Sequence, residues 1–212
     1  MNAGLLAAAA VLVIAAGAAA DEPRAPAAPE RIVRYYESGE YAADVKEATR
    51  GATRSLTAQL ANKPHRPAMV LDIDDTLEST YACAKRSNFD RTAITVCQAR
   101  LDQTPIRPVW SLVRLAQRRN VAIVVITARP QGLDAGTRKQ LKDDGLKGRY
   151  TLVMRPDAEF GKPAAAFKTA ARRAIQKRGY SVLVNVGDQR SDLVGGYAVK
   201  RVKVPNPMYV SH

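Results

Sequence analysis

Three apolar runs of the chain are each followed by side chains that could bind a metal ion and a phosphate group. Asp72 and Asp74 follow the first run, Thr127 and Arg129 follow the second, and Asp188 follows the last. Carboxylates, a hydroxyl and a cation together suit a divalent metal ion and a phosphoryl group. Ligands of open α/β sheets bind beyond the carboxyl ends of the strands, where these residues fall. The full set is Asp72, Asp74, Asp75, Thr76, Thr127, Ala128, Arg129, Gly187, Asp188 and Asp192.

The spacing of Asp72 and Asp74 favours a hard divalent cation. Alternate residues of an extended chain point to the same side, so the two carboxylates would repel each other unless a cation lay between them. Mg²⁺ prefers oxygen ligands, keeps several waters and commonly binds one or two carboxylates together with substrate phosphate oxygens. We therefore expect Mg²⁺ at this site, with Asp188 as the ligand from the other strand.

Several other chemistries are excluded by missing motifs. The sequence has no G-x-x-x-x-G-K-[ST] loop, no G-x-S-x-G elbow and no G-x-G-x-x-G fingerprint. Neither cysteine is followed six positions later by arginine, and His65 and His212 lie away from the strand ends, so cysteine and histidine phosphatase mechanisms are disfavoured. A calcium loop starting at Asp72 would need glycine and glutamate where Leu77 and Cys83 stand.

The apolar runs and the helical patterns between them predict a parallel sheet. Continuous runs rich in β-branched residues indicate strands buried on both faces, and alternation with helices indicates crossover connections. The expected strands are residues 67–74, 121–126, 150–154 and 181–186, with a short last strand at 200–204. The expected helices are residues 109–119, 133–145 and 163–178. The fold class is therefore α/β, with three layers.

The start of the chain has the pattern of an export signal. Residues 3–20 carry no charged residue, residues 5–16 form an apolar stretch and residues 18–20 are small, which predicts a signal peptide at 1–20 followed by a linker at 21–29. An uncleaved membrane anchor is the alternative, because the leading segment has no Lys or Arg. Residues 30–212 then form a single domain, which opens with a helical lead-in at 30–62 that breaks near Ser38 and Gly39, where Ser38 can cap the second helix.

Residues 77–107 do not fit the alternation of strands and helices, so we assign them to a small cap inserted after the first strand. This insertion carries Cys83 and Cys97. In an oxidising compartment the two cysteines can pair and close a loop of about fifteen residues, which would contribute roughly 3 kcal/mol. Two buried free thiols are the alternative.

The chain is strongly basic. It has 212 residues and a formal net charge of +13, and residues 1–20 carry none of it. Positive residues on outer faces of the expected helices could bind nucleic acid or another anionic polymer, but a solubilising surface is the simpler interpretation, and we expect no specific nucleic acid partner. These residues are Arg114, Arg118, Arg119, Arg138, Lys139, Lys142, Arg172, Arg173, Lys177 and Arg178.

Five segments together resemble the haloacid dehalogenase superfamily, within it the acid phosphatase group that includes plant vegetative storage proteins and bacterial class B-like enzymes. Residues 70–76 resemble its D-x-D-x-T motif, and residues 125–129 resemble its second motif, an apolar strand ending in a hydroxyl residue. Residues 167–172 are similar to Y-K-S-x-x-R, and residues 186–193 to G-D-Q-x-S-D-L. The ending, residues 195–209, also resembles this group.

The resemblance implies a role for each matching residue. Asp72 would be the nucleophile that accepts the phosphoryl group, and Asp74 would protonate the leaving oxygen and then activate water. Thr127 would hold a phosphoryl oxygen, and Lys168 would offset negative charge, with Lys162 as its rival.

By the same resemblance, Mg²⁺ would be bound by the Asp72 carboxylate, the backbone carbonyl of Asp74 and the Asp188 carboxylate. Asp192 would not contact the ion but would support the residues that bind it. Ala128 and Arg129 are candidate substrate contacts, although Arg129 could equally be a surface charge.

The implied function is an exported, Mg²⁺-dependent acid phosphatase that hydrolyses small phosphomonoesters through an aspartyl-phosphate intermediate. The alternative is a non-catalytic storage protein, or an anion- or nucleic-acid-binding protein, on the same fold. Departures from the group's pattern at Phe167, Arg190 and residues 77–80 concern substrate choice, because none of them removes a reacting group. Stacking of an aromatic substrate on Trp110 or Tyr81 is an alternative to a packing role for these residues.

Overall fold

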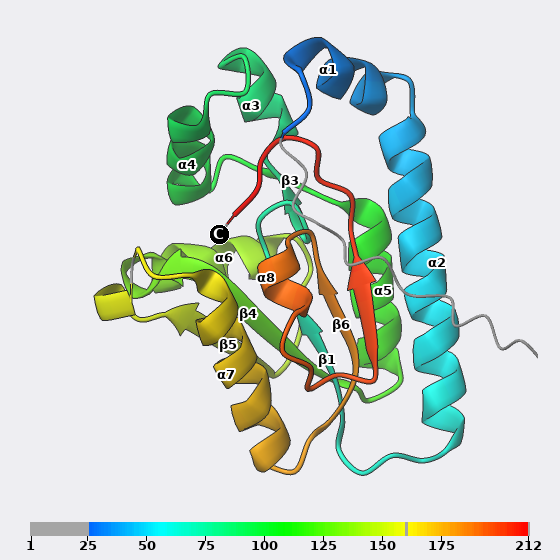
Figure 1. Cartoon of the computed structure of the whole chain (residues 1–212). Coiled ribbons are helices and arrows are strands. Elements are labelled where there is room, and N and C mark those ends of the chain that lie inside the picture. The colour runs from blue at the N-terminus through cyan, green and yellow to red at the C-terminus, as the bar shows by residue number, and fades with distance from the viewer. Residues whose placement is uncertain (1–25, 160, 212) are drawn as a thin grey trace, which may run out of the picture.

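The computed structural model describes residues 26–159 and 161–211. Its centre is a parallel sheet of five strands in the order β5-β4-β1-β6-β7 (Figure 1). The strands are β1 (Pro67–Leu71), β4 (Ala122–Pro130), β5 (Tyr150–Arg155), β6 (Ser181–Gly187) and β7 (Lys200–Lys203). The predicted α/β class and the parallel sheet are confirmed. The predicted signal peptide, residues 1–20, lies outside the described residues.

Helices cover both faces of the sheet, because alternate strand residues point to opposite sides. Met69 and Leu71 of β1 pack in a core with residues of α2 and α5, whereas Val70 packs in a second core with residues of α7. The helices of these layers are α2 (Glu40–Ala61), α5 (Arg107–Arg118), α6 (Asp134–Asp143) and α7 (Ala164–Lys177). None of the helices in the described part of the chain is long and apolar enough to cross a membrane.

The boundaries differ from the sequence-based expectations at several ends. The first strand ends at Leu71, since the chain turns into a loop before the second carboxylate, and β4 continues to Pro130. The expected helix 133–145 is preceded by a short helix, η1 (Gln131–Leu133). The expected helix 109–119 starts earlier, at Arg107, because a proline in the first turn lacks only an N–H that would have no partner there.

The helical lead-in consists of α1 (Pro29–Glu37) and α2, with the break at the expected place. Our prediction that Ser38 caps the second helix is wrong by one residue, because the capping residue is Gly39. Gly39 has φ 86°, a left-handed conformation that glycine adopts without a steric penalty. The Ser38 hydroxyl still accepts the Glu40 N–H, at 3.3 Å.

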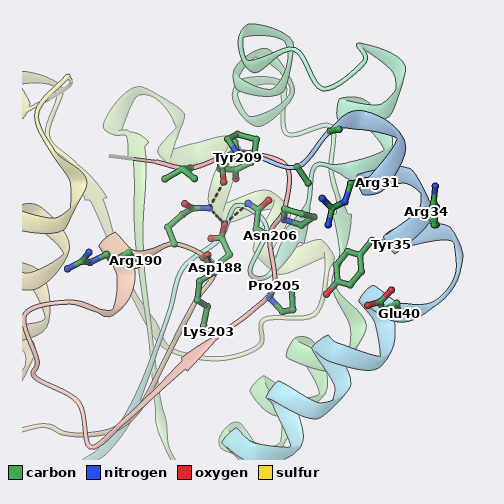
Figure 2. Close-up of a pocket in the computed structure, with 16 residues that line it drawn as sticks. Arg31, Arg34, Tyr35, Glu40, Asp188, Arg190, Lys203, Pro205, Asn206 and Tyr209 are labelled. Atoms are coloured by element: carbon green, nitrogen blue, oxygen red, sulfur yellow. Dashed lines mark hydrogen bonds between the residues drawn. The ribbon is translucent and has the colours of Figure 1, made fainter. Parts of the chain in front are cut away.

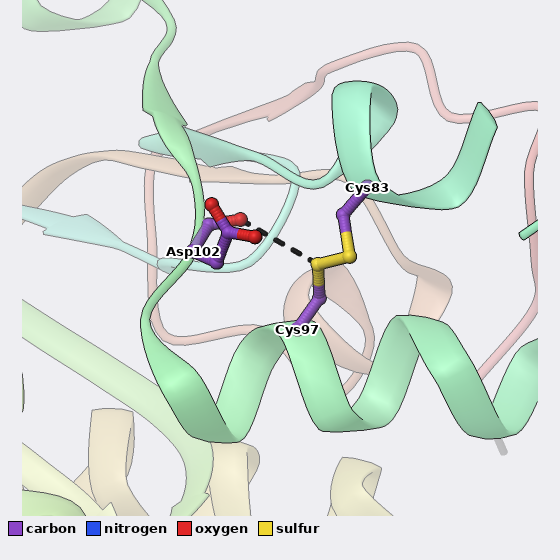
Figure 3. Close-up of side chains that lie close together, drawn as sticks. All are labelled: Cys83, Cys97 and Asp102. Carbon is purple, nitrogen blue, oxygen red and sulfur yellow. Dashed lines mark hydrogen bonds between the residues drawn. A yellow bond between two sulfur atoms is a disulfide. The ribbon is translucent and has the colours of Figure 1, made fainter. Parts of the chain in front are cut away.

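The segment between β1 and α5 forms a small unit above the carboxyl end of the sheet (Figure 1). Its strands β2 (Glu78–Ser79) and β3 (Thr104–Pro105) pair in antiparallel fashion and bracket α3 (Tyr81–Arg86) and α4 (Arg91–Arg100). A disulfide between Cys83 and Cys97 joins the two helices (Figure 3). Both sulfurs are therefore bonded, so these cysteines and the adjacent Asp102 offer no thiolate to a metal ion.

An aromatic stack fastens the lead-in to this inserted unit. The Tyr36 ring lies between those of Tyr41 and Tyr81, with ring centroids 4.0 and 3.9 Å apart. Tyr81 is therefore a partly buried packing residue, and it does not line the cavity over Asp72. Trp110 is fully buried and donates its indole N–H to Glu78, so it too is a packing residue.

Candidate active site

The register of the sheet brings the three polar segments to one edge. Leu71, the last residue of β1, pairs with Val125 of β4 and with Val186 of β6, so the residues that follow these three positions lie at the same edge of the sheet. The next residue, Asp72, donates its backbone N–H to the Val186 carbonyl at 3.1 Å. Asp188 follows at the end of β6. The register of the three central strands therefore places these side chains together.

Lys168 is the buried cation of the site. Its ammonium lies 2.7 Å from an Asp72 oxygen and also forms an ion pair with Asp192. Burial works to lower the pKa of Lys168, but the two carboxylates outweigh it and raise the pKa. Lys162, the alternative lysine, is exposed. Lys168, from α7, is thus the lysine that the fold brings to Asp72.

A buried carboxylate cluster fits a divalent cation. Asp72, Asp188 and Asp192 each offer an oxygen within 4.8 Å of the other two. They are 6%, 1% and 2% exposed, and Lys168 compensates one of their three negative charges. Burying uncompensated like charges is costly, and a hard cation is the natural partner of an all-oxygen set. Among the described residues, this donor set suits Mg²⁺ or a similar ion.

Hydrogen bonds hold the Asp188 carboxylate in one orientation, as expected of a metal ligand. Its two oxygens accept bonds from the Thr76 hydroxyl at 3.2 Å and from the amides of Asn206 at 2.7 Å and Gln189 at 2.5 Å. Burial and the neighbouring Asp192 raise the pKa of Asp188 to about 7. A cation at this position would oppose that shift by favouring the ionised carboxylate.

Asp192 is held where a side chain at position 187 would collide with it. Gly187 has no side chain, and a Cβ there would overlap the Asp192 carboxyl group. The Asp192 carboxylate accepts the Gln189 backbone N–H at 2.8 Å, and its carbonyl accepts the Asn185 amide at 2.8 Å. These contacts fix the position of Asp192. Asp192 forms an ion pair with Lys168 and also belongs to the carboxylate cluster.

Arg129 is buried in the site and paired with Asp74. Its guanidinium donates to both Asp74 oxygens, with the shortest contact at 2.8 Å, and Arg129 is 4% exposed. The alternative that Arg129 is a surface charge is therefore wrong. Burial works to raise the pKa of Asp74, but Arg129 and a hydrogen bond from Gln103 outweigh it and lower the pKa.

Gln103 and Gln140 complete the network around Arg129. The Gln103 amide donates to Asp74 at 2.8 Å and its oxygen accepts from Arg129 at 2.6 Å. Gln140, on α6, accepts from Arg129 at 2.9 Å. Sequence reasoning missed both glutamines, because they come from elements distant along the chain and neutral amides match no motif. Gln103 belongs to the inserted unit, which thereby contacts the candidate acid directly.

Asp75 and Thr127 are buried and form structural hydrogen bonds beside the reacting groups. Asp75 is fully buried and accepts bonds from the Thr80 hydroxyl at 2.6 Å and the Tyr209 hydroxyl at 2.7 Å. Burial raises the pKa of Asp75 to about 6. Thr127 is also fully buried, and its hydroxyl accepts the Arg129 backbone N–H at 3.2 Å. Asp75 thus ties the inserted unit to the C-terminal segment, and Thr127 shapes the turn before Arg129.

A cavity of about 400 Å³ opens over Asp72 and Asp74. Strand ends, α4 and the C-terminal segment contribute to its wall, and its volume lies in the roughly 300–1,000 Å³ range of small-molecule sites. Sequence reasoning did not identify the contributions of α4, Arg155 or Tyr209, whose positions depend on tertiary packing. The lining residues that bear on function are Asp72, Asp74, Arg91, Thr95, Gln98, Ala128, Arg129, Arg155, Lys168, Asp188 and Tyr209.

A second cavity of about 740 Å³ lies on the other side of Asp188, between α1 and the C-terminal segment (Figure 2). Arg31 and Tyr35 line it from α1, and Asn206 and Lys203 line it from the chain after β6. Lys203 donates to the Asp188 carbonyl at 2.8 Å. Asp188 therefore stands between the two cavities.

A parallel sheet with Asp72, Lys168 and Asp188 at its carboxyl edge agrees with the haloacid dehalogenase class of fold that the sequence motifs predicted. A model of the family described as HAD superfamily, subfamily IIIB (Acid phosphatase), matches residues 8–212. The chain belongs to this family.

Curated relatives come from plants. Acid phosphatase 1 of Solanum lycopersicum is 26% identical over 150 residues, which are 68% of this chain and 59% of the relative. Vegetative storage protein 1 of Arabidopsis thaliana is 27% identical over 146 residues, 66% of this chain and 54% of the relative. The chain thus spans less than two thirds of the length of these relatives.

Among solved structures, the class C acid phosphatase from Bacillus anthracis has the same fold. It superposes with a TM-score of 0.69 at 18% identity over 86% of each chain. A structure of the same enzyme with tungstate bound gives a TM-score of 0.68 at 19% identity, also over 86% of each chain. These likenesses support the three-layer fold.

Proposed function

We propose that the protein is an acid phosphatase that hydrolyses small phosphomonoesters through a phosphoryl group carried on Asp72, with Mg²⁺ as its cofactor. The observation that carries this proposal is the pairing of Asp72 with buried Lys168 at the floor of a cavity that Asp74 and Arg129 also line. Family membership supports the reaction class. The description as an acid phosphatase comes from the family alone.

In the first step, an Asp72 carboxylate oxygen attacks phosphorus while the bond to the alcohol oxygen breaks. Lys168 offsets the charge shared by the nucleophile and the phosphoryl oxygens. Asp74 gives a proton to the departing alcohol oxygen. The two negative charges of the substrate phosphate compete with the Asp74 carboxylate for the Arg129 guanidinium. Once Asp74 no longer pairs with Arg129, it can hold the proton that it gives to the alcohol oxygen.

In the second step, a water molecule attacks phosphorus and Asp74 takes its proton. The bond between phosphorus and the Asp72 oxygen breaks, which frees inorganic phosphate and restores the carboxylate. Asp188, the Asp72 carboxylate and the Asp74 carbonyl would bind Mg²⁺, and Asp192 would position Lys168. Mg²⁺, when bound, would supply positive charge that stabilises the transferred phosphoryl group.

We also propose export, from the apolar segment at residues 1–20. The disulfide between Cys83 and Cys97 supports this proposal, since disulfides persist in oxidising compartments. Residues 21–29 would link a cleaved signal to the single domain, with residues 77–107 as its cap.

A non-catalytic storage protein is the second candidate, favoured by the likeness to a plant protein named a vegetative storage protein. A protein without catalysis has no need of a nucleophile, an acid and a metal-binding carboxylate in one cavity. Asp72, Asp74 and Asp188 all line the same cavity here, which favours the enzyme.

The test is hydrolysis of p-nitrophenyl phosphate by the purified protein from about pH 4 to 8, with Mg²⁺ or with EDTA. We expect turnover that EDTA abolishes. Asp188→Asn should weaken Mg²⁺ binding by at least about tenfold in calorimetric titration, with activity restored by excess Mg²⁺. Absence of turnover from folded, Mg²⁺-loaded protein would favour the storage protein, and unchanged Mg²⁺ affinity in Asp188→Asn would remove Asp188 from the ligand set.

A further inference from the structure

Helix α4 of the inserted unit turns a polar face to the cavity over Asp72. Arg91, Thr95 and Gln98 all line this cavity, and their spacing places them on one side of a helix. The disulfide fastens α4 to α3, and the Asp90 carboxylate caps its first turn by accepting the Ala93 N–H at 2.8 Å. This wall of the cavity is therefore fixed and polar.

Arg91 is held in one orientation by an aromatic ring. Its guanidinium carbon lies 4.2 Å from the centroid of the Tyr209 ring. Tyr209 is 5% exposed, donates its hydroxyl to Asp75 at 2.7 Å and accepts the Gln98 amide at 3.1 Å. A guanidinium stacked on a ring keeps the N–H groups of its edge available for a bidentate bond to an anion.

Arg91 is a cation of the cavity wall in addition to those that pair with the reacting carboxylates. Arg129 is paired with Asp74, and Lys168 is paired with Asp72. Within the described part of the chain, no carboxylate lies within ion-pair distance of Arg91, so its charge is available to a ligand.

We propose that Arg91 binds a second anionic group on the substrate. The preferred substrates are compact phosphomonoesters whose alcohol part carries a carboxylate or a second phosphate. This inference rests on the proposed phosphatase function and adds the substrate class. A nucleoside fits less well, because Tyr209 is the one aromatic residue among the described residues that line the cavity, and Arg91 covers its ring.

A matched pair of substrates tests the proposal. The value of kcat/KM is measured for 3-phosphoglycerate, which carries a carboxylate, and for glycerol 3-phosphate, which does not. We expect the wild-type protein to favour 3-phosphoglycerate by about tenfold, the effect of one charge-assisted hydrogen bond at a partly exposed site. In Arg91→Gln the ratio should fall to about one. Arg100→Gln removes the same charge from an exposed position at the other end of α4 and should leave the ratio at its wild-type value.

Equal kcat/KM for the two substrates in the wild-type protein would overturn the proposal, as would a preference that persists in folded Arg91→Gln. A loss of preference in Arg100→Gln as large as that in Arg91→Gln would also overturn it, because a general electrostatic attraction would then be the cause. Failure of the proposed function is distinguishable, since the wild-type protein would then hydrolyse neither these substrates nor p-nitrophenyl phosphate with Mg²⁺.

Discussion

Glu78 is a carboxylate buried where charge is unfavourable. It is 0% exposed, accepts the Trp110 indole N–H at 3.1 Å through one oxygen, and its other oxygen has no hydrogen-bond partner in the described structure. Burial, and next the negative charge of Asp144, raise the pKa of Glu78 to about 8. Glu78 therefore holds a proton at neutral pH in the folded protein, whereas in the unfolded chain it is ionised.

This burial predicts a pH-dependent stability. The folded state binds a proton that the unfolded state releases from about pH 4.5 to 8, so stability falls as pH rises through this window. Because each unit of pKa shift corresponds to about 1.4 kcal/mol, Glu78→Gln should be more stable than the wild-type protein by a few kcal/mol above pH 8.

Urea unfolding at about pH 5 and pH 8.5 measures this difference. The control is Glu30→Gln, which removes an exposed carboxylate and should follow the wild-type protein at both values. A Glu78→Gln variant that keeps the same stability relative to the wild-type protein at both pH values would show that Glu78 is ionised when folded.

The residues of the site were predictable to different degrees. Asp72 and Asp188 follow apolar strands, and the motif around Lys168 selects it over Lys162, so their proximity in the structure agrees with expectation. The pairing of Asp74 with Arg129 was not predictable, because it depends on which of several neighbouring charges the fold brings to 2.8 Å.

At the scale of elements, the apolar runs predicted the sheet well because strands buried on both faces have few alternatives. The short elements were harder. The helix α8 (Arg190–Leu193) and the strands β2 and β3 are too short for a periodic pattern, and tertiary contacts maintain them. The inserted unit was predicted as a break in the pattern, without its internal structure.

The inserted unit contacts the reaction centre through Gln103, beside β3, which predicts a role in positioning Asp74. In Gln103→Leu, Asp74 loses one of its hydrogen bonds and its orientation. A poor leaving group needs the proton from Asp74, whereas p-nitrophenolate departs without it. We expect kcat to fall about tenfold or more for an alkyl phosphate and much less for p-nitrophenyl phosphate.

The control for this prediction is Gln59→Leu on α2, whose amide donates to the Leu183 carbonyl and which does not line the cavity. It should not change the ratio of alkyl to aryl turnover. If Gln103→Leu lowers both substrates equally, Gln103 has a structural role without influence on the proton transfer.

At the scale of the whole molecule, one covalent bond strengthens the inserted unit. The disulfide joins residues fourteen positions apart. Closure of a loop of this size stabilises the folded state by roughly 3 kcal/mol in the chain-entropy model. We expect the Cys83→Ser, Cys97→Ser double variant to lose about this amount in urea unfolding. A loss below about 1 kcal/mol would indicate that packing alone maintains the unit.

The basic charge of the molecule is partly paired on its surface. On α6, Arg138 forms an ion pair with Asp134 at 2.8 Å, and Lys139 forms one with Asp143 at 2.5 Å. Exposed pairs of this kind contribute little to stability and keep the surface well hydrated. Arg172 does not belong to the predicted basic surface, because it is 1% exposed and donates to the Asp192 carbonyl. A solubilising surface remains our prediction for the other basic residues of these helices, with an anionic polymer as the alternative ligand.

The central claim is that Asp72 carries the phosphoryl group, and direct capture of that group tests it. In Asp74→Asn the base for the second step is missing, whereas p-nitrophenyl phosphate can still phosphorylate the protein without an acid. Rapid acid quench, peptide digestion and mass spectrometry should find one phosphoryl group on the peptide that contains Asp72. The same treatment of an Asp72→Asn, Asp74→Asn double variant should find none. A phosphoryl group on another residue, or turnover retained by Asp72→Asn, would contradict the account.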